Sequence, residues 1–489
     1  MVQAQTSQPL MHIQFQPTGT SHQLRLGSGY NWFDYLGMGG HYADSASYPL
    51  TDPVYPDLTD ASAWSNVLAE LTYLRPGLIR FGLPPDPELD SAGRLVTNTV
   101  HLARLRRVSR WAETHGCTIV LDTFLLPRRF AGLRPAAAES SAMVQMAATN
   151  NRAYAQAFVA PLLRFLAASP DFKAVRYFNP VNEPMCYGIY QTPAGGPDVW
   201  ETYVDMYREL RLALDEAGVS RQRIGLVGID RTSAAPMDML EWLDRTPAID
   251  PFVDAYTIHY YYLRFDHYPP RPEIAPSATI AEALDRQTAE LVRACQRRGK
   301  PLWAVELGTF YNGWRVGDPA GVASLDSALI VAEAVIRGLN VGLDGFAFWS
   351  LFNPNTIDGH FAIIGVEHGG ITRFGWPWKV YSTLTRLVRP GTEVFPLHAE
   401  KRETALVYLH AVALRYADGT RALLVINDHP NEPGDARFTL PPAYGVLPRH
   451  RLMLNAAGVQ VGVNNGTQAQ IVPPMTLCVF SDQSETAGR

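Results

Sequence analysis

The chain has 489 residues, of which 47% are hydrophobic and 18% charged, and its formal net charge is -5. This composition excludes a disordered protein and supplies enough apolar residues for a large core. Because basic and acidic residues are interspersed along the chain, no basic stripe marks a polyanion site, and we expect no nucleic-acid partner. At this length we expect one large domain and one smaller domain.

The cysteines and the N-terminus bear on redox state and location. The four cysteines have neither CxxC spacing nor a paired framework, so we expect free thiols at Cys117, Cys186, Cys295 and Cys478. Residues 1–17 lack a basic segment followed by an apolar run, and no stretch approaches the roughly 20 apolar residues of a membrane span. We therefore expect a soluble, cytoplasmic protein with no membrane partner, with secretion after loss of a signal peptide as the alternative.

Between about residue 30 and residue 390, short apolar runs alternate with segments of helical period. This alternation predicts repeated βα units around a parallel sheet, with helices such as Ala61–Leu74, Val100–His115 and Ala281–Arg298. The candidate strands number eight, as in a (β/α)8 TIM barrel. They are Tyr35–Gly39, Leu78–Gly82, Thr118–Thr123, Val175–Val181, Ile224–Ile229, Ala255–Tyr260, Pro301–Leu307 and Gly345–Leu351.

After Pro390 the pattern changes to short alternating strands separated by turn residues, such as Arg421–Asn427 and Leu477–Ser481. This pattern predicts a smaller C-terminal antiparallel β-sandwich. The alternation over His12–Gln16 is a candidate for one more strand of that sandwich. We therefore divide the chain into an N-terminal segment (1–23), a barrel (24–390) and a β-sandwich domain (391–489).

Two glutamates lie at the C-terminal ends of predicted barrel strands, where the active sites of TIM barrels lie. Glu183 follows the fourth strand in an Asn-Glu-Pro sequence, and Glu306 ends the seventh. Such a pair suits hydrolysis of a glycosidic bond with retention, in which one carboxylic acid protonates the leaving oxygen and one carboxylate attacks the anomeric carbon. The tripeptide alone is a weak signal, because Asn-Glu-Pro recurs around Glu432 in the β-sandwich region.

With both strand positions in place, the pattern resembles clan A of the glycoside hydrolases over roughly residues 30 to 390. In that clan the acid/base follows the fourth strand and the nucleophile ends the seventh, which implies these roles for Glu183 and Glu306. The resemblance also implies that Arg80 keeps the nucleophile ionised and that Asn182 contacts the substrate.

The end of the sixth strand, His259-Tyr260-Tyr261, resembles the His-x-Tyr of family 5, and Trp349 matches the tryptophan under the bound sugar. The third strand lacks the family 5 histidine and carries Asp122 in its place, while the Leu36–His41 stretch and the β-sandwich are closer to families 30 and 39. We therefore leave the family open. Further candidates for lining sugar subsites are Asp122, His41, Trp32, Tyr311, Trp314, His360 and Phe361.

The resemblance therefore implies a carbohydrate substrate with β-type, equatorial glycosidic bonds. No cofactor is expected. A transglycosylase with the same residues and a noncatalytic carbohydrate-binding barrel stay as alternatives. A metal-dependent hydrolase is a weaker one, because the sequence has no HxH or HExxH spacing, and we expect no metal site. The sugar, exo or endo action and the oligomeric state are left open.

Overall fold

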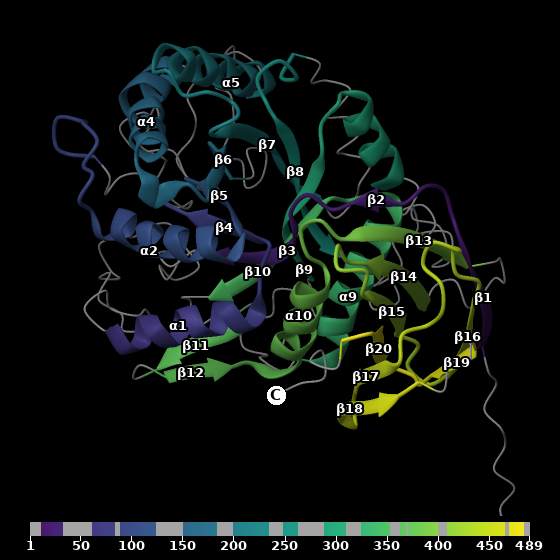
Figure 1. Cartoon of the computed structure of the whole chain (residues 1–489). Helices are drawn as coiled ribbons and strands as arrows, with labels where there is room; N and C mark the ends of the chain where they lie inside the picture. The colour runs from purple at the N-terminus through teal and green to yellow at the C-terminus, as the bar shows by residue number, and fades with distance from the viewer. Residues whose placement is uncertain are drawn as a thin grey trace, which may run out of the picture.

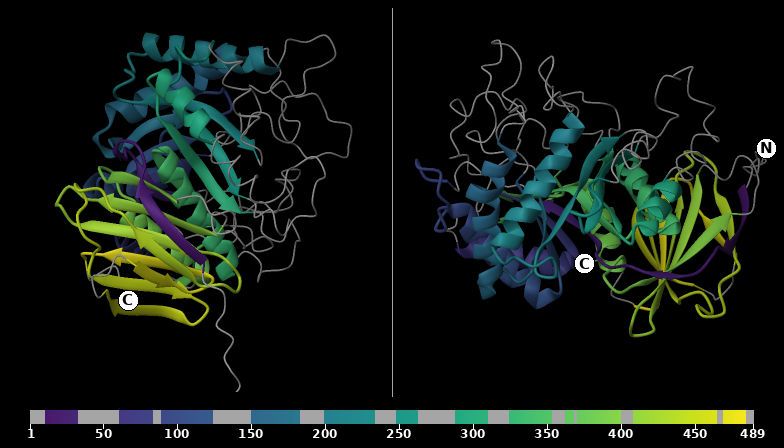
Figure 2. Two further views of the ribbon diagram at one scale, coloured as in Figure 1. Left: turned by 90° about the vertical axis from the view of Figure 1, so that its right-hand side faces the viewer. Right: turned by 90° about the horizontal axis from the view of Figure 1, so that it is seen from above.

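The computed structural model describes residues 11–32, 61–83, 89–123, 150–182, 199–233, 248–262, 288–309, 324–352, 362–367, 370–399, 408–464 and 469–483. A closed parallel barrel with surrounding helices lies beside a body of mostly antiparallel strands (Figures 1 and 2). The expected TIM barrel with a smaller β-sandwich is thereby confirmed.

Eight parallel strands close the barrel in the order β10, β3, β4, β5, β6, β7, β8, β9. A separate cluster of apolar side chains, including Leu78, Val120 and Trp303, fills the inside of the barrel. Because side chains alternate along a strand, Arg80 and Asp122 point inward as Leu78 and Val120 do. The strands are β3 (Gly27–Trp32), β4 (Leu78–Gly82), β5 (Thr118–Asp122), β6 (Val175–Asn179), β7 (Gly225–Ser233), β8 (Ala255–Tyr262), β9 (Leu302–Thr309) and β10 (Gly345–Phe352).

The first barrel strand is β3, so the expectation of a first strand over Tyr35–Gly39, which lies outside the described residues, was wrong. The sequence of β3 is rich in small and polar residues and has no apolar run. Small residues are needed there because a Cβ atom on Gly29 would lie 1.6 Å from the carbonyl oxygen of Leu78 on β4. Close approach of two backbones therefore selected glycine over the apolar residues that usually mark a strand.

The helices between the strands begin and end at recognisable residues. At α2, the Thr99 side chain accepts a hydrogen bond from the Leu102 amide, and Gly116 ends the helix with a φ of 68°. The helices with both ends described are α1 (Ala61–Leu74), α2 (Val100–His115), α3 (Asn151–Tyr154), α4 (Ala160–Ala168), α5 (Val199–Glu216), α9 (Leu325–Val341) and α10 (Gly375–Leu387), with a π-helical turn η2 (Ala155–Val159) and a 3-10 turn η3 (Pro170–Phe172). None of the described helices combines the length and the apolar composition that a membrane span requires.

The smaller domain is one folded sheet in the order β18, β17, β20, β15, β14, β13, β1, β16, β19, with β2 paired to β13. Phe15 on β1 and Phe438 on β16 lie in one apolar core with Val425 on β15 and Phe480 on β20, so the sheet forms a sandwich. The strands are β1 (Met11–Pro17), β2 (His22–Gln23), β13 (Glu393–Ala399), β14 (Leu409–Arg415), β15 (Arg421–Asn427), β16 (Gly434–Phe438), β17 (His450–Asn455), β18 (Gly458–Val463), β19 (Ala469–Val472) and β20 (Thr476–Ser481).

Helix α9 lies between the barrel and the β-sandwich (Figure 1). All of its residues from Ser327 to Leu339 are buried, as expected for a helix covered on all sides. The Asn340 side chain donates to the carbonyl oxygen of Ala411 on β14 and accepts from the amide of Leu397 on β13. These two hydrogen bonds fix the C-terminal end of α9 to the sandwich.

A short hairpin of β11 (Ile364–Glu367) and β12 (Gly370–Arg373) lies in the long segment after β10. Arg373 on this hairpin pairs with the buried carboxylate of Glu70 on α1 at 2.7 Å. The Trp378 indole donates to the same carboxylate at 2.7 Å. The segment is thus attached to the outer wall of the barrel.

At the N-terminal end of β10, Asp344 is buried beside the start of β3. Its Oδ1 accepts the backbone amide of Arg25 at 2.6 Å, and its Oδ2 lies 3.5 Å from the Arg25 Nε. Burial, only partly offset by these contacts, raises the pKa of Asp344 from 3.8 to about 6. This carboxyl lies at the end of the barrel opposite the C-terminal strand ends.

Candidate active site

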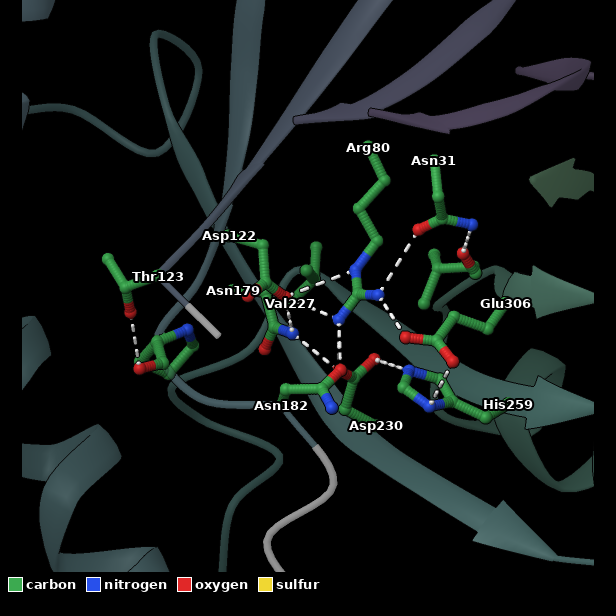
Figure 3. Close-up of polar contacts among 12 residues, drawn as sticks. Asn31, Arg80, Asp122, Thr123, Asn179, Asn182, Val227, Asp230, His259 and Glu306 are labelled. Carbon is green, nitrogen blue, oxygen red and sulfur yellow. Dashed lines mark hydrogen bonds and ion pairs between the residues drawn. The ribbon is translucent and has the colours of Figure 1, made fainter. Parts of the chain in front are cut away.

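Seven of the eight barrel strands place a polar side chain in one cluster around the Arg80 guanidinium (Figure 3). The described members of this cluster come from successive strands: Asn31 (β3), Arg80 (β4), Asp122 (β5), Asn179 (β6), Asp230 (β7), His259 (β8) and Glu306 (β9), with Asn182 just after β6. All of them are buried, and they lie toward the C-terminal ends of the strands, the usual place of a TIM-barrel active site.

The Arg80 side chain is the centre of the cluster and has no solvent exposure. Its Nη1 donates to Oε1 of Glu306 at 2.6 Å, and its Nη2 lies 2.5 Å from Oδ2 of Asp122 and 2.8 Å from Oδ2 of Asp230. Nη2 also contacts Oδ1 of Asn182 at 2.6 Å. Burial opposes the charge, but the three carboxylates outweigh it and raise the pKa of Arg80. Arg80 is therefore a permanent cation facing Glu306.

Glu306 has a basic group at each carboxylate oxygen. Oε1 accepts from Arg80, and Oε2 lies 3.3 Å from Nδ1 of His259. Asn31 holds the neighbouring backbone, because its side-chain amide donates to the carbonyl oxygen of Val305 at 2.8 Å. The Glu306 residue is only 3% exposed. A carboxylate between two fixed basic groups is kept ionised and cannot rotate freely.

Asp230 was missed by the sequence reasoning, although it directly follows the predicted strand Ile224–Ile229. Its backbone has a φ of 57°, and the pairing of β7 with β8 shifts register between Ile229 and Arg231. The resulting bulge points the side chain at Arg80 and at His259, whose Nε2 lies 3.0 Å from Oδ1 of Asp230. Burial disfavours the charge, but Arg80, His259 and a hydrogen bond from Asn179 together lower the pKa of Asp230.

Asn179 and Asn31 were also missed as members of the site. The Asn179 side-chain nitrogen contacts Asp122 Oδ2 at 2.5 Å and Asp230 Oδ2 at 2.6 Å, so it joins two carboxylates that would otherwise repel each other. The available signal for Asn179 was that it interrupts the apolar run of the predicted strand Val175–Val181, whereas Asn31 lay in no predicted strand and gave no such signal. An asparagine in a buried strand needs partners, which only the neighbouring strands can supply.

The chain that leads from β6 to Asn182 is held by two hydroxyl groups. Thr123 and Tyr154 both donate to the carbonyl oxygen of Pro180, at 2.8 and 2.9 Å. Asn182 itself is fixed by Arg80. Glu183, the next residue, lies outside the described part of the chain, so its role as acid/base stays a prediction.

The other expected site residues differ in where the structure places them. His41 and Tyr311, with Trp314, His360 and Phe361, lie outside the described residues, and Tyr261 is described only as part of the backbone of β8. Trp349 is half-buried on β10, where its proposed place under a sugar stays a prediction. Trp32 is only 1% exposed and packs against Trp64, Phe81 and Phe352, so the expectation that it lines a subsite was wrong.

Asp122 was expected to line a sugar subsite. It has no solvent exposure, and its Oδ2 accepts from both Nε and Nη2 of Arg80, at 3.1 and 2.5 Å. Its described contacts thus bind it to Arg80 and Asn179, and its expected contact with a sugar stays a prediction. The second Asn-Glu-Pro sequence lies between β15 and β16, where the Glu432 amide donates to His429 Nδ1. That glutamate is part of a turn in the sandwich.

No protein-family model matches the sequence, and no curated protein is similar to it in sequence. Solved structures with the same fold include three glycoside hydrolases. The catalytic domain of the GH30 xylanase C from Talaromyces cellulolyticus is 15% identical, with a TM-score of 0.58 over 96% of this chain and 99% of that one. An endo-β1,6-glucanase is 13% identical, with a TM-score of 0.59 over 97% and 94%.

The GH51 arabinofuranosidase from Xanthomonas axonopodis pv. citri is 13% identical, with a TM-score of 0.57 over 96% of this chain and 100% of that one. In all three comparisons the alignment spans both the barrel and the β-sandwich, because it covers nearly the whole of each chain. The chain therefore has the fold of the clan A glycoside hydrolases.

Proposed function

We propose that this protein is a retaining glycoside hydrolase that cleaves β-type glycosidic bonds, with Glu306 as the nucleophile and Glu183 as the acid/base. The observation that carries the proposal is the position of Glu306 at the mouth of the barrel, between Arg80 at 2.6 Å and His259 at 3.3 Å. The fold, shared with solved glycoside hydrolases, supports the same reaction class.

The environment of Glu306 suits a nucleophile better than a proton donor. A general acid must keep its proton, which usually requires an apolar or negatively charged surrounding. Glu306 instead accepts a charge-assisted hydrogen bond from a cation that three carboxylates keep protonated. Its charge is therefore available to attack an anomeric carbon at neutral pH.

In the first step a carboxylate oxygen of Glu306 forms a bond to the anomeric carbon as the bond from that carbon to the leaving oxygen breaks. Glu183 gives its proton to the leaving oxygen, which departs as an alcohol. The glycosylated Glu306 carries no charge, so Glu183 can then take a proton from water. That water attacks the anomeric carbon, releases Glu306 and yields a sugar of retained configuration.

Asn182 belongs to this proposal as the residue that binds the substrate beside Glu306. Its Oδ1 is held by Arg80, which fixes the amide plane relative to the nucleophile. A hydrogen bond from a fixed amide to the sugar 2-hydroxyl would strengthen as positive charge develops on the ring. Trp349 is proposed to form the floor under the same sugar.

The first test replaces Glu306 with Gly and adds azide to an activated aryl β-glycoside, after a screen of nitrophenyl glycosides has found one that the wild type cleaves. The expected result is a loss of at least about a thousandfold in kcat, and a glycosyl azide of inverted configuration in the rescued reaction. Unchanged hydrolysis by Glu306→Gly would refute the assignment.

The acid/base role is tested with a matched pair of variants, because the chain has two Asn-Glu-Pro sequences. Glu183→Ala should slow substrates with poor leaving groups by about 10²- to 10⁴-fold and affect dinitrophenyl glycosides much less. Glu432→Ala, at the second sequence, should keep wild-type rates on both. Equal losses on both substrate types in Glu183→Ala would contradict the acid role.

A further inference from the structure

Four ionisable side chains, Glu306 among them, form a closed ring of contacts (Figure 3). Glu306 Oε1 contacts Arg80 Nη1, and Arg80 Nη2 contacts Asp230 Oδ2 at 2.8 Å. The ring continues from Asp230 Oδ1 to His259 Nε2 at 3.0 Å and returns from His259 Nδ1 to Glu306 Oε2 at 3.3 Å. Each carboxylate thus uses one oxygen toward Arg80 and the other toward His259.

The groups that face the two ring nitrogens of His259 bear on its protonation state. An ionised carboxylate only accepts hydrogen bonds, and a neutral imidazole carries a single N–H. Asp230 is ionised, because Arg80 and Asn179 both donate hydrogen bonds to its Oδ2. Glu306 is ionised because Arg80 donates to it. A carboxylate oxygen lies within ion-pair distance of each ring nitrogen, and a bare nitrogen lone pair would repel it, so both contacts favour a protonated ring.

The balance of buried charges around His259 also favours a protonated ring. The described charged groups around His259 are Asp230 on β7, Glu306 on β9, Arg80 on β4 and Asp122 on β5. With a neutral histidine, a single guanidinium would face three buried carboxylates. A protonated histidine supplies a second cation, and buried charges are tolerated only when they are paired.

From this arrangement we propose that Asp230 is a positioning residue that holds His259 as an imidazolium against Glu306, so that the nucleophile is flanked by two cations. The protonation state of His259 is independent of the proposed function, whereas the role of the two cations in catalysis rests on it. Asp230 acts through His259 and Arg80 and does not need to touch the substrate. Its left-handed backbone is consistent with this role, because a φ of 57° is uncommon outside glycine, asparagine and aspartate and here directs the carboxylate toward both cations.

The two cations and Asp230 act at each stage of the reaction. Before attack, the two cations hold both oxygens of Glu306 and keep the group ionised. After Glu306 has been glycosylated, its charge is lost, and Asp230 remains as the counter-ion that keeps His259 protonated and in place. The ring is then ready to receive the carboxylate again when water releases the sugar.

The protonation state can be measured without any substrate. In the full-length protein prepared with isotope-labelled histidine, His259 should show two ring N–H signals in the NMR spectrum near neutral pH. The signals are assigned by their disappearance in His259→Gln. A single N–H signal from His259 in the wild type would overturn the proposal, whatever the activity of the protein.

The role of Asp230 is tested with Asp230→Asn and a matched control, Asp122→Asn. Asparagine keeps the shape and tolerates a positive φ, so the bulge can be retained. Asp230→Asn should remove one of the two His259 N–H signals near neutral pH. Asp122→Asn removes a charge from the same cluster, but Asp122 contacts Arg80 and Asn179, so both His259 signals should persist. Two His259 signals in Asp230→Asn would refute the positioning role.

Kinetics provides the second readout, on a glycoside that the wild type cleaves. Asp230→Asn should lower kcat at least about tenfold with a smaller change in KM, and the alkaline limb of its pH profile should move to lower pH, because the imidazolium loses its counter-ion. An unshifted alkaline limb would count against the proposal. If no glycoside is cleaved by the wild type, the proposed function fails, while the NMR result still decides the state of His259.

Discussion

Asp344, at the end of the barrel away from the candidate site, allows a quantitative test of burial. Its pKa is raised from 3.8 to about 6 in the folded protein, chiefly by burial. Ionising it in the fold is therefore about 3 kcal/mol less favourable than in the unfolded chain, since each pKa unit is worth roughly 1.4 kcal/mol. The protonated carboxyl favours folding fully below pH 3.8, and this contribution is lost as the pH rises through about 6.

The substitution Asp344→Asn removes the ionisation and keeps an oxygen to accept the Arg25 amide, which lies 2.6 Å from Oδ1. The variant should match the wild type in stability near pH 3.5 and exceed it by up to about 3 kcal/mol at pH 8. For 489 residues, an unfolding entropy of roughly 2 cal/mol/K per residue converts this to about 3 °C in Tm.

The assay is thermal unfolding of both proteins across that pH range. Arg25→Ala serves as the control, because its exposed guanidinium at 3.5 Å from Asp344 contributes at most about 1 kcal/mol. That control should lower Tm slightly at pH 8 and leave it unchanged at pH 3.5. A parallel pH dependence of wild type and Asp344→Asn would refute the reasoning.

Two further predictions concern the barrel and its central cation. Arg80→Lys keeps the positive charge but loses the planar guanidinium that contacts Glu306, Asp122 and Asp230 at once. The kcat/KM on a nitrophenyl glycoside that the wild type cleaves should therefore fall about 10²-fold or more. A loss below threefold would show that charge alone suffices. Gly29→Ala places a Cβ atom 1.6 Å from the Leu78 carbonyl oxygen. This change should lower the free energy of unfolding by more than about 3 kcal/mol or abolish soluble expression. An unchanged Tm would contradict the close packing of β3 on β4.

The sequence predicted those parts of the fold that depend on apolar patterning. β4, β5 and β9 stand out because continuous apolar runs are what a strand buried on both faces requires. β3 escaped notice because its closest contact is with the backbone of β4, and that contact selects glycine. In the sandwich, β15 and β20 were recognised, whereas β13 and β17, whose alternation includes histidine and arginine, were not.

At the candidate active site, too, some residues were predicted from the sequence and others were not. Arg80, Asn182, His259 and Glu306 were named because each lies at a predicted strand end, and the structure brings them together. Asp230 could not be placed from sequence, because its direction depends on a bulge and a positive φ that no residue pattern announces. A rule that inspects every acidic residue just after a barrel strand would have included it.

The position of β1 couples the two ends of the folded chain. Phe15 on β1 pairs with Ala399 on β13 and also with Phe438 on β16, while all barrel strands lie between these partners in sequence. The sandwich therefore cannot complete its core until the whole barrel segment has been synthesised, and contacts of such long sequence separation form slowly. Once formed, they oppose unfolding from either end, because neither terminal strand can leave without opening the sheet that contains the other.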